Sequence, residues 1–359
     1  MNCTTVFKKN ISIFSVPWFD LSRKGYLIFF LILFLHQPTV FAGKYLTTSK
    51  KKLLLQAQTY LFNDQFSFAH RQLDSLIKLY PNDPIGYLFQ GAVCLAQMID
   101  QEDNLNSKEF ARLMDTAIFL AKDKIDTTNR MRTSWMYYCL GQAHAYKSLW
   151  ESKYGSFTSA IKSGREAKSE YEKGLQYDST LYDLYGGLGM YHYWKSVKAG
   201  ILRWLHLFKN EKQKGINELY LTLDSSSISK YSARNALIWI WMDKKVYDSV
   251  ITISQEMLSQ FPEGKIFLWP LAKAYYLNKD YTNALDTYLR LRERLLKSPG
   301  NYYNIIECDY SLYQCYDKLK RKDKAKQIAT NLTQYYQKIP KKIRWRQRSK
   351  LAFLKRMAK

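Results

Sequence analysis

The chain has 359 residues, of which 47% are hydrophobic and 24% are charged. This apolar content is enough to bury a core, so a largely disordered chain is excluded. The 15 glycines and 8 prolines also exclude a collagen-like or Gly/Pro-rich low-complexity chain. Because 55 Lys and Arg stand against 31 Asp and Glu, the net charge is +24, and an anionic partner or surface has to be considered.

Residues 1–42 have the pattern of a secretory signal peptide. Basic residues, among them Arg23 and Lys24, precede an unbroken apolar run over 26–35, and a small residue, Ala42, follows shortly after it. A basic start, a short apolar run and a small-residue cleavage site are typical of export, whereas a span across a bilayer needs about 20 apolar residues. We expect cleavage after Ala42 and an exported protein, periplasmic or in the cell envelope. Retention of the segment as an uncleaved anchor stays open.

The rest of the chain contains an internal repeat, seen best by comparing residues 50–83 with residues 265–298. At the same offsets both segments carry a small residue, an aromatic residue and a second small residue: Ala57, Tyr60 and Ala69 in the first, and Ala272, Tyr275 and Ala284 in the second. Small residues let two helices approach closely, and Pro81 ends the first segment because proline cannot continue a helix. Each segment therefore predicts a helix, a short turn and a second helix.

This pattern resembles the tetratricopeptide repeat (TPR), a 34-residue helical hairpin with small residues at positions 8 and 20 and an aromatic residue at position 11. In that frame the chain has about seven units, near 50–83, 84–127, 131–180, 181–227, 231–264, 265–299 and 306–339. The resemblance implies an all-α fold, a right-handed TPR superhelix (an α-solenoid) over residues 43–340. Ile238 and Tyr313 depart from the small-residue rule at position 8, so looser or shifted packing is expected there.

Units two to four are longer than the others. Positions 8 and 20 lie twelve residues apart in unit one, but 26 apart in these three units. The fourteen extra residues are close to four helical turns, so two added turns in each helix would keep every packing face. In unit four the extra segment includes the apolar run 199–208, which is expected to fold back or to meet a membrane or partner. With the preceding residues 185–191, this insert is similar to a TPR family of exported bacterial proteins.

Residues 341–359 carry nine cations and no acid, while Leu351, Leu354 and Ala358 form a helical apolar stripe. A terminal repeat needs a cover with a polar outer face, so the segment predicts a capping helix, and contact with an anionic surface is the alternative. The cysteines that remain after export are expected to be buried free thiols: Cys94, Cys139, Cys308 and Cys315.

No catalytic or metal motif is present: the sequence lacks HExxH, CxxC and the P-loop pattern. His144 and His192 stand at position 11, where other units have Tyr, and are expected to be packing residues. We therefore expect no enzyme activity, no metal and no cofactor. Nucleic acid is not favoured as a partner, because the cations outside 341–359 are spread out and the N-terminus indicates export.

The resemblance implies that positions 5 and 9 of the first helices line the inner groove, where TPR proteins bind proteins or peptides. The expected partner-binding residues at these positions are Tyr138, Trp239, Trp269, Lys273, Tyr310 and Gln314. Aromatic side chains there suit peptide binding, although burial between repeats is the alternative for some of them. The sequence thus predicts a non-catalytic protein- or peptide-binding scaffold of the cell envelope. The alternative is a membrane-associated assembly factor that uses the insert 199–208 and the basic tail.

Overall fold

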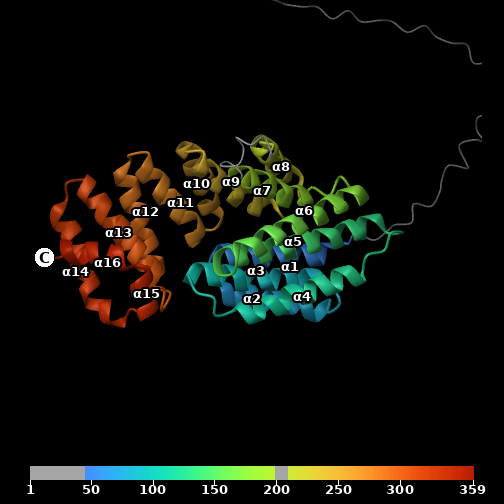
Figure 1. Cartoon of the computed structure of the whole chain (residues 1–359), viewed down its shortest axis with the longest axis horizontal. Coiled ribbons are helices and arrows are strands. Elements are labelled where there is room, and N and C mark those ends of the chain that lie inside the picture. The colour runs from blue at the N-terminus through green and yellow to red at the C-terminus, as the bar shows by residue number, and fades with distance from the viewer. Residues whose placement is uncertain (1–44, 199–208) are drawn as a thin grey trace, which may run out of the picture. The chain divides into compact units, whose positions relative to one another are not determined.

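The structure, a computed structural model, describes residues 45–198 and 209–359. Within these residues the chain forms sixteen α-helices, one short 3-10 helix and no strand. The first fourteen helices pair in chain order into seven hairpins, each packed against the next (Figure 1). The expected α-solenoid of about seven hairpins is therefore confirmed. The signal segment 1–42 and the insert 199–208 lie outside the described residues.

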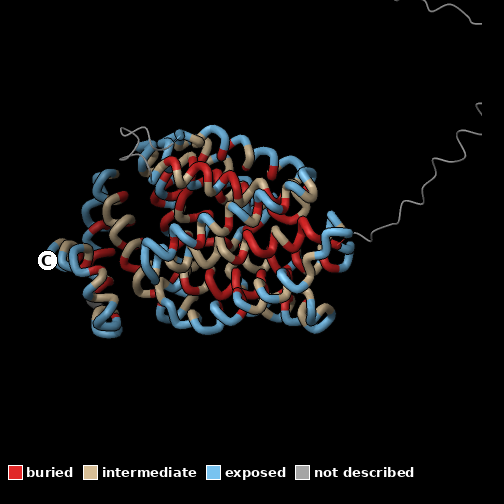
Figure 2. The backbone as a smooth tube through the Cα atoms, turned by 45° about the vertical axis from the view of Figure 1, so that its right-hand side comes forward, coloured by how far each residue is buried: buried red, intermediate tan, exposed pale blue. Residues whose placement is uncertain are grey.

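The hairpins are called units one to seven here, and two further helices follow them. The bounds are α1 (Thr48–Phe62) and α2 (Phe66–Leu79), α3 (Pro84–Gln101) and α4 (Ser107–Asp123), α5 (Arg130–Tyr154) and α6 (Phe157–Tyr177), α7 (Asp183–Lys198) and α8 (Lys212–Ser225), α9 (Lys230–Asp243) and α10 (Tyr247–Gln260), α11 (Lys265–Leu277) and α12 (Tyr281–Leu296), α13 (Tyr302–Lys318) and α14 (Lys322–Tyr335), then α15 (Lys341–Arg346) and α16 (Arg348–Met357). Buried stretches alternate with exposed ones along the helices, as amphipathic helices require (Figure 2).

The small residues at positions 8 and 20 set the helix spacing, most clearly in unit four. A Cβ atom on Gly189 would lie 2.7 Å from the carbonyl oxygen of Gly215, and one on Gly215 would lie 2.5 Å from that of Gly189. The backbones of α7 and α8 are thus closer than any side chain at these positions would permit. In unit seven the large Tyr313 at position 8 packs edge-on against Phe353 of α16, with ring centroids 5.1 Å apart.

The expectation of two added turns in each helix is confirmed for unit three, whereas the helices of unit two exceed those of unit one by only three residues each and α8 of unit four is not lengthened. Helices α3 and α4 have 18 and 17 residues, and α5 and α6 have 25 and 21, against 15 and 14 in unit one. In unit four α7 has 16 residues, but α8 has only 14. Helix α8 begins at Lys212, three residues before Gly215, as α2 begins three residues before Ala69. The extra residues of unit four therefore do not lengthen its second helix.

Units one and two also contact units five to seven, far away in sequence. The ring of Phe62, at the end of α1, lies 5.2 Å from that of Phe261 and 5.6 Å from that of Phe267. A Cβ atom on Gly264 would lie 2.4 Å from the carbonyl oxygen of Phe62, so only glycine allows this approach. The α1–α2 turn is thus packed directly against the start of α11.

Polar groups strengthen the same contact. Gly264 is the N-cap of α11 and offers no side chain, but the Asp64 carboxylate accepts a hydrogen bond from the Lys265 backbone N–H at 2.8 Å. A residue of unit one therefore caps a helix of unit six, where a negative charge is favourable. The side-chain amides of Asn301 and Asn304, at the start of unit seven, donate to the backbone carbonyl of Asp100 at the end of α3. The lengthened α3 thereby reaches the units that follow α10.

The two added helices cover the last hairpin. Helix α16 packs on α13 and α14 and buries Leu351 and Leu354. Arg346 in α15 donates to the backbone carbonyl and the carboxylate of Glu102, each at 2.7 Å, in the turn of unit two. The four cysteines in the described residues are buried and free, as expected: Cys94, Cys139, Cys308 and Cys315.

Candidate functional site

Helices α7, α9 and α11 are the first helices of units four, five and six. Helix α9 contacts both α7 and α11, so the three form one side of the solenoid. Position 9 of these three helices is held by Met190, Trp239 and Lys273, which together we call the inner stripe. All three side chains are exposed, Met190 to 37% and Trp239 to 42%. Outside the inner stripe, Gln58 occupies the same position in unit one, but it is buried and donates to the carbonyl of Ile228. The side chain at position 9 is therefore exposed to solvent in units four to six, but not in unit one.

Trp239 is the most open of the predicted aromatic residues. It makes no hydrogen bond and no ring contact with any part of the chain that the structure describes. Lys273, one unit further on, lies with its ammonium group 5.8 Å from the ring centre of Tyr276. The inner stripe thus combines two large apolar side chains and one cation on neighbouring helices.

Two other predicted residues are taken up by internal packing. Tyr138 is 3% exposed, and its hydroxyl oxygen lies 3.4 Å from that of Ser229, so it links unit three to unit five. Burial raises the pKa of this tyrosine well above its ordinary value. Trp269 is half-buried and packs edge-on against Tyr288 of α12, with ring centroids 6.3 Å apart. Neither side chain lies free on a surface, as the alternative of burial between repeats anticipates.

Tyr310 and Gln314, predicted for the groove of unit seven, lie beside the capping helix. The ring of Tyr310 packs edge-on against Phe353 of α16, with centroids 5.3 Å apart. The Gln314 amide donates to the hydroxyl of Tyr310 at 3.3 Å. Both are half-buried, and a hollow next to Tyr310 has α16 as its second wall. The capping helix therefore reshapes the groove at its last unit.

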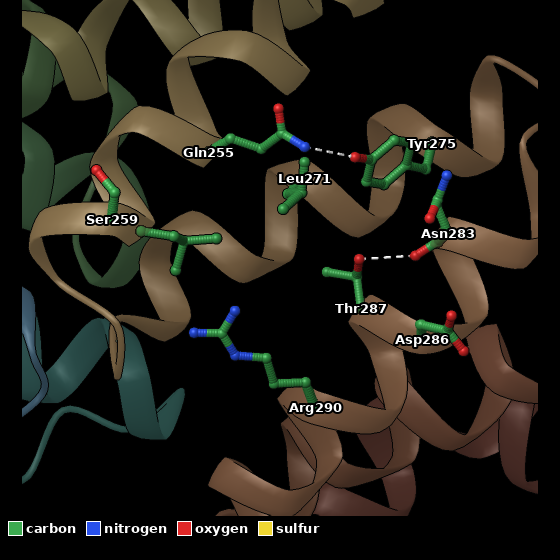
Figure 3. Close-up of a pocket in the computed structure, with 9 residues that line it drawn as sticks. Gln255, Ser259, Leu271, Tyr275, Asn283, Asp286, Thr287 and Arg290 are labelled. Carbon is green, nitrogen blue, oxygen red and sulfur yellow. Dashed lines mark hydrogen bonds between the residues drawn. The ribbon is translucent and has the colours of Figure 1, made fainter.

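A separate hollow of about 340 Å³ lies among α10, α11 and α12 (Figure 3). Its walls mix amide, hydroxyl and charged groups: Gln255, Leu258, Ser259, Leu271, Tyr275, Asn283, Asp286, Thr287 and Arg290. The Gln255 amide donates to the hydroxyl of Tyr275 at 2.9 Å, and Arg290 donates to the carbonyl of Pro262. These polar groups are already satisfied within the protein, and no nucleophile stands beside a base, so the hollow does not have the arrangement of a catalytic centre.

His144 and His192, the two histidines expected to be packing residues, each lie beside a glutamate, Glu166 and Glu218. Nδ1 of His192 lies 2.6 Å from a carboxylate oxygen of Glu218, and the ring is 1% exposed. Burial lowers the pKa of His144, which is also enclosed. Over the described ranges no group of His, Cys, Asp and Glu could hold a metal ion, and no helix there is long and apolar enough to cross a membrane.

No protein-family model matches the chain, and no curated protein matches it in sequence. Among solved structures it is similar to yeast Tom70, at 13% identity over 87% of this chain and 82% of that chain, with a TM-score of 0.31. It is also similar to the TPR domain of P58(IPK), at 14% identity over 86% of this chain and 89% of that chain, with a TM-score of 0.20. Neither likeness assigns a role to any residue, so the site is defined by this chain's own contacts.

Proposed function

We propose that the protein is a non-catalytic scaffold that binds a protein or peptide at the inner stripe. The observation that carries this proposal is the exposure of Trp239 on α9, at 42%, and of Met190 on the contacting helix α7, at 37%. Large apolar side chains left in water on contacting helices favour a binding role, because their exposure costs free energy that a partner would recover. Tryptophan in particular supplies much contact area with few torsions to freeze.

The partner should carry an apolar side chain that packs on Met190 and Trp239. It should also carry a carboxylate or another hydrogen-bond acceptor that meets the Lys273 ammonium group. The test is selection of peptides from a random display library on the immobilised full chain, followed by affinity measurements with single variants. We expect Trp239→Ala to weaken the selected peptides by roughly 30-fold, the usual effect of removing an aromatic anchor.

The matched control is Tyr220→Ala on α8, because Tyr220 is also 42% exposed but belongs to a second helix. It should leave the affinity within about twofold, as surface changes away from an interface do. Equal affinity of the Trp239→Ala variant and the unaltered chain would show that the inner stripe is not the binding site.

We also propose that the scaffold acts outside the cytoplasm, in the periplasm or cell envelope. The support is the sequence pattern of residues 1–42, a basic lead with an apolar run and Ala42 before Gly43. N-terminal sequencing of the protein purified from cells should begin at Gly43. An intact N-terminus on protein recovered from the cytoplasm would contradict this location.

The membrane-associated alternative depends on the insert 199–208, which the described residues do not include, and on the basic helices α15 and α16. Tryptophan fluorescence of the chain in the presence of anionic liposomes tests it, since Trp204 lies within the insert. A blue shift would favour the membrane role.

A further inference from the structure

The last two helices form a basic surface whose charges are only partly neutralised. Of the nine cations in 341–359, three reach acids of the hairpins: Lys342 pairs with Asp103, Arg346 with Glu102, and Lys350 with Glu307. The other six have no acidic partner among the described residues: Lys341, Arg344, Arg348, Lys355, Arg356 and Lys359. Five of these six cations lie on α15 and α16, and Lys359 follows α16, so this end of the chain has a strongly positive face.

Several of these cations are held in place by aromatic rings. Lys355 lies 3.4 Å from the ring centre of Tyr336, and its hydrogen bond lowers the pKa of that phenol. Arg348 stacks on Trp345 at 4.9 Å, and Arg356 lies 5.8 Å from the ring centre of Phe353. Stacking limits the motion of a long side chain, so less conformational entropy is lost when a partner binds.

A hollow opens beside this face, between α13 and α16. This open hollow has a volume of about 620 Å³ and is lined by Tyr310, Ser349, Lys350, Ala352, Phe353 and Arg356. Five of these residues belong to α16, and four of them, at positions 349, 352, 353 and 356, share one face by helical spacing. The hollow therefore has aromatic walls, a small residue that leaves room, and two cations.

We propose that this hollow and the positive face around it, which we call the cap site, bind an acidic peptide segment that carries one apolar side chain. The apolar side chain lies against the packed rings of Tyr310 and Phe353, over the small Ala352. The flanking carboxylates meet Arg356 and the cations along α16 that lack acidic partners. The charge selects the acidic segment, and the size of the hollow selects a single side chain over the flat surface of a lipid bilayer. The cap site is separate from the inner stripe, so it does not depend on the function proposed above.

The test is fluorescence anisotropy of the full chain with a short fluorescein-labelled peptide of alternating Glu and Ser around a central Leu. One control peptide has Gln in place of Glu, and a second has Ser in place of Leu. We expect the acidic Leu peptide to bind with salt-sensitive affinity and both controls to bind at least about tenfold more weakly.

Two variants locate the binding. Arg356→Glu should weaken it by about tenfold or more, whereas Lys162→Glu, an equal charge change at an exposed site on α6, should change it by less than about twofold. Ala352→Leu fills the hollow without altering charge, and since Ala352 is exposed the fold should tolerate it. It should reduce binding of the Leu peptide to the level of the Ser control.

Other results would overturn the proposal. Equal weakening by Arg356→Glu and Lys162→Glu would show that only net charge matters. Absence of binding to the acidic peptide, with tight binding to phosphatidylglycerol vesicles unaffected by Ala352→Leu, would identify the face as a membrane contact. Loss of peptide binding in the Trp239→Ala variant would place the peptide on the inner stripe rather than at the cap site.

Discussion

The ammonium group of Lys265 lies 2.9 Å from the carboxylate of Asp100, although 165 residues separate the two in the sequence. Lys265 begins α11 in unit six, and Asp100 stands near the end of α3 in unit two. A solenoid is usually stabilised by contacts between adjacent repeats alone. This ion pair, in which Lys265 is buried and Asp100 half-buried, instead joins distant units, so unfolding of the first hairpins and of the last ones should be coupled.

The first prediction concerns this pair. Lys265 is only 3% exposed, so Lys265→Met leaves two half-buried carboxylates, Asp64 and Asp100, without their cation. Removing one partner of a buried pair typically costs about 3–5 kcal/mol. We expect a clear fall in Tm, with faster hydrogen exchange in α1, α3 and α11. The control is Lys297→Met, which breaks an exposed pair with Glu293 and should change stability by less than about 1 kcal/mol. Equal effects of the two variants would show that the distant contact contributes little.

The second prediction concerns pH. Burial raises the pKa of Asp64 from 3.8 to about 7, with Asp100 and Glu263 raising it further and Lys265 opposing them. The folded protein therefore holds a proton between about pH 4 and about pH 7 that the unfolded chain has released, so the free energy of unfolding rises as pH falls through 7. The contribution is at most about 1.4 kcal/mol per pH unit, and it ends below the unfolded pKa.

Asp64→Asn tests this contribution, because asparagine keeps an acceptor for the Lys265 N–H and tolerates the positive φ of 58° at this turn. The Tm of the variant should exceed that of the unaltered chain at about pH 8, and this difference should shrink towards about pH 5. A difference that stays constant over this range would rule out titration of Asp64 as its source.

The hairpins could be predicted from sequence because their signals are local. Ala57 and Ala69, or Gly189 and Gly215, stand at fixed spacings, and each pair marks where two consecutive helices meet. The lengthening of unit three followed from the same spacing, since whole turns preserve the packing face, whereas each helix of unit two gained less than one turn. In unit four the same spacing wrongly predicted a longer α8. The number of residues between two positions does not show whether those residues continue a helix.

The contact between units one and six could not be predicted in this way. It depends on small rotations accumulated over several repeats, which no local pattern records. The sequence held one hint of this contact. The hairpin turns of units five to seven have a lysine with positive φ, namely Lys245, Lys279 and Lys320, whereas the turn of unit one has an acid, Asp64, at the same place. For Tyr138 the sequence left burial open but gave no means to choose it, because its partner Ser229 lies 91 residues away.

The third prediction concerns the close approach at Gly264. In Gly264→Ala the new Cβ atom would lie 2.4 Å from the carbonyl oxygen of Phe62, a backbone atom that cannot move alone. We expect a loss of stability of roughly 1–3 kcal/mol, as overpacking usually causes, together with faster hydrogen exchange at the end of α1 and the start of α11. Gly300→Ala is the control, since Gly300 has a φ of 85° but no atom within 4 Å of a new Cβ. It should strain only its own turn, so faster exchange at the end of α1 in this variant too would argue against a specific clash at Gly264.

The fourth prediction separates the two tryptophans that the repeat pattern places in the groove. Trp269 is half-buried against Tyr288, so Trp269→Ala removes core packing and should lower stability by about 2–4 kcal/mol. Trp239 is exposed and touches no other ring in the described chain, so Trp239→Ala should change stability by less than about 0.5 kcal/mol. Thermal unfolding followed by circular dichroism measures both, and peptide affinity measured on the folded fraction gives the second comparison. Trp239→Ala should weaken binding with an unchanged Tm, whereas Trp269→Ala should lower Tm and leave the affinity of the remaining folded molecules nearly unaltered. The reverse pattern would move the binding surface from the inner stripe to the α11–α12 hairpin, with Trp239 reduced to an ordinary exposed side chain.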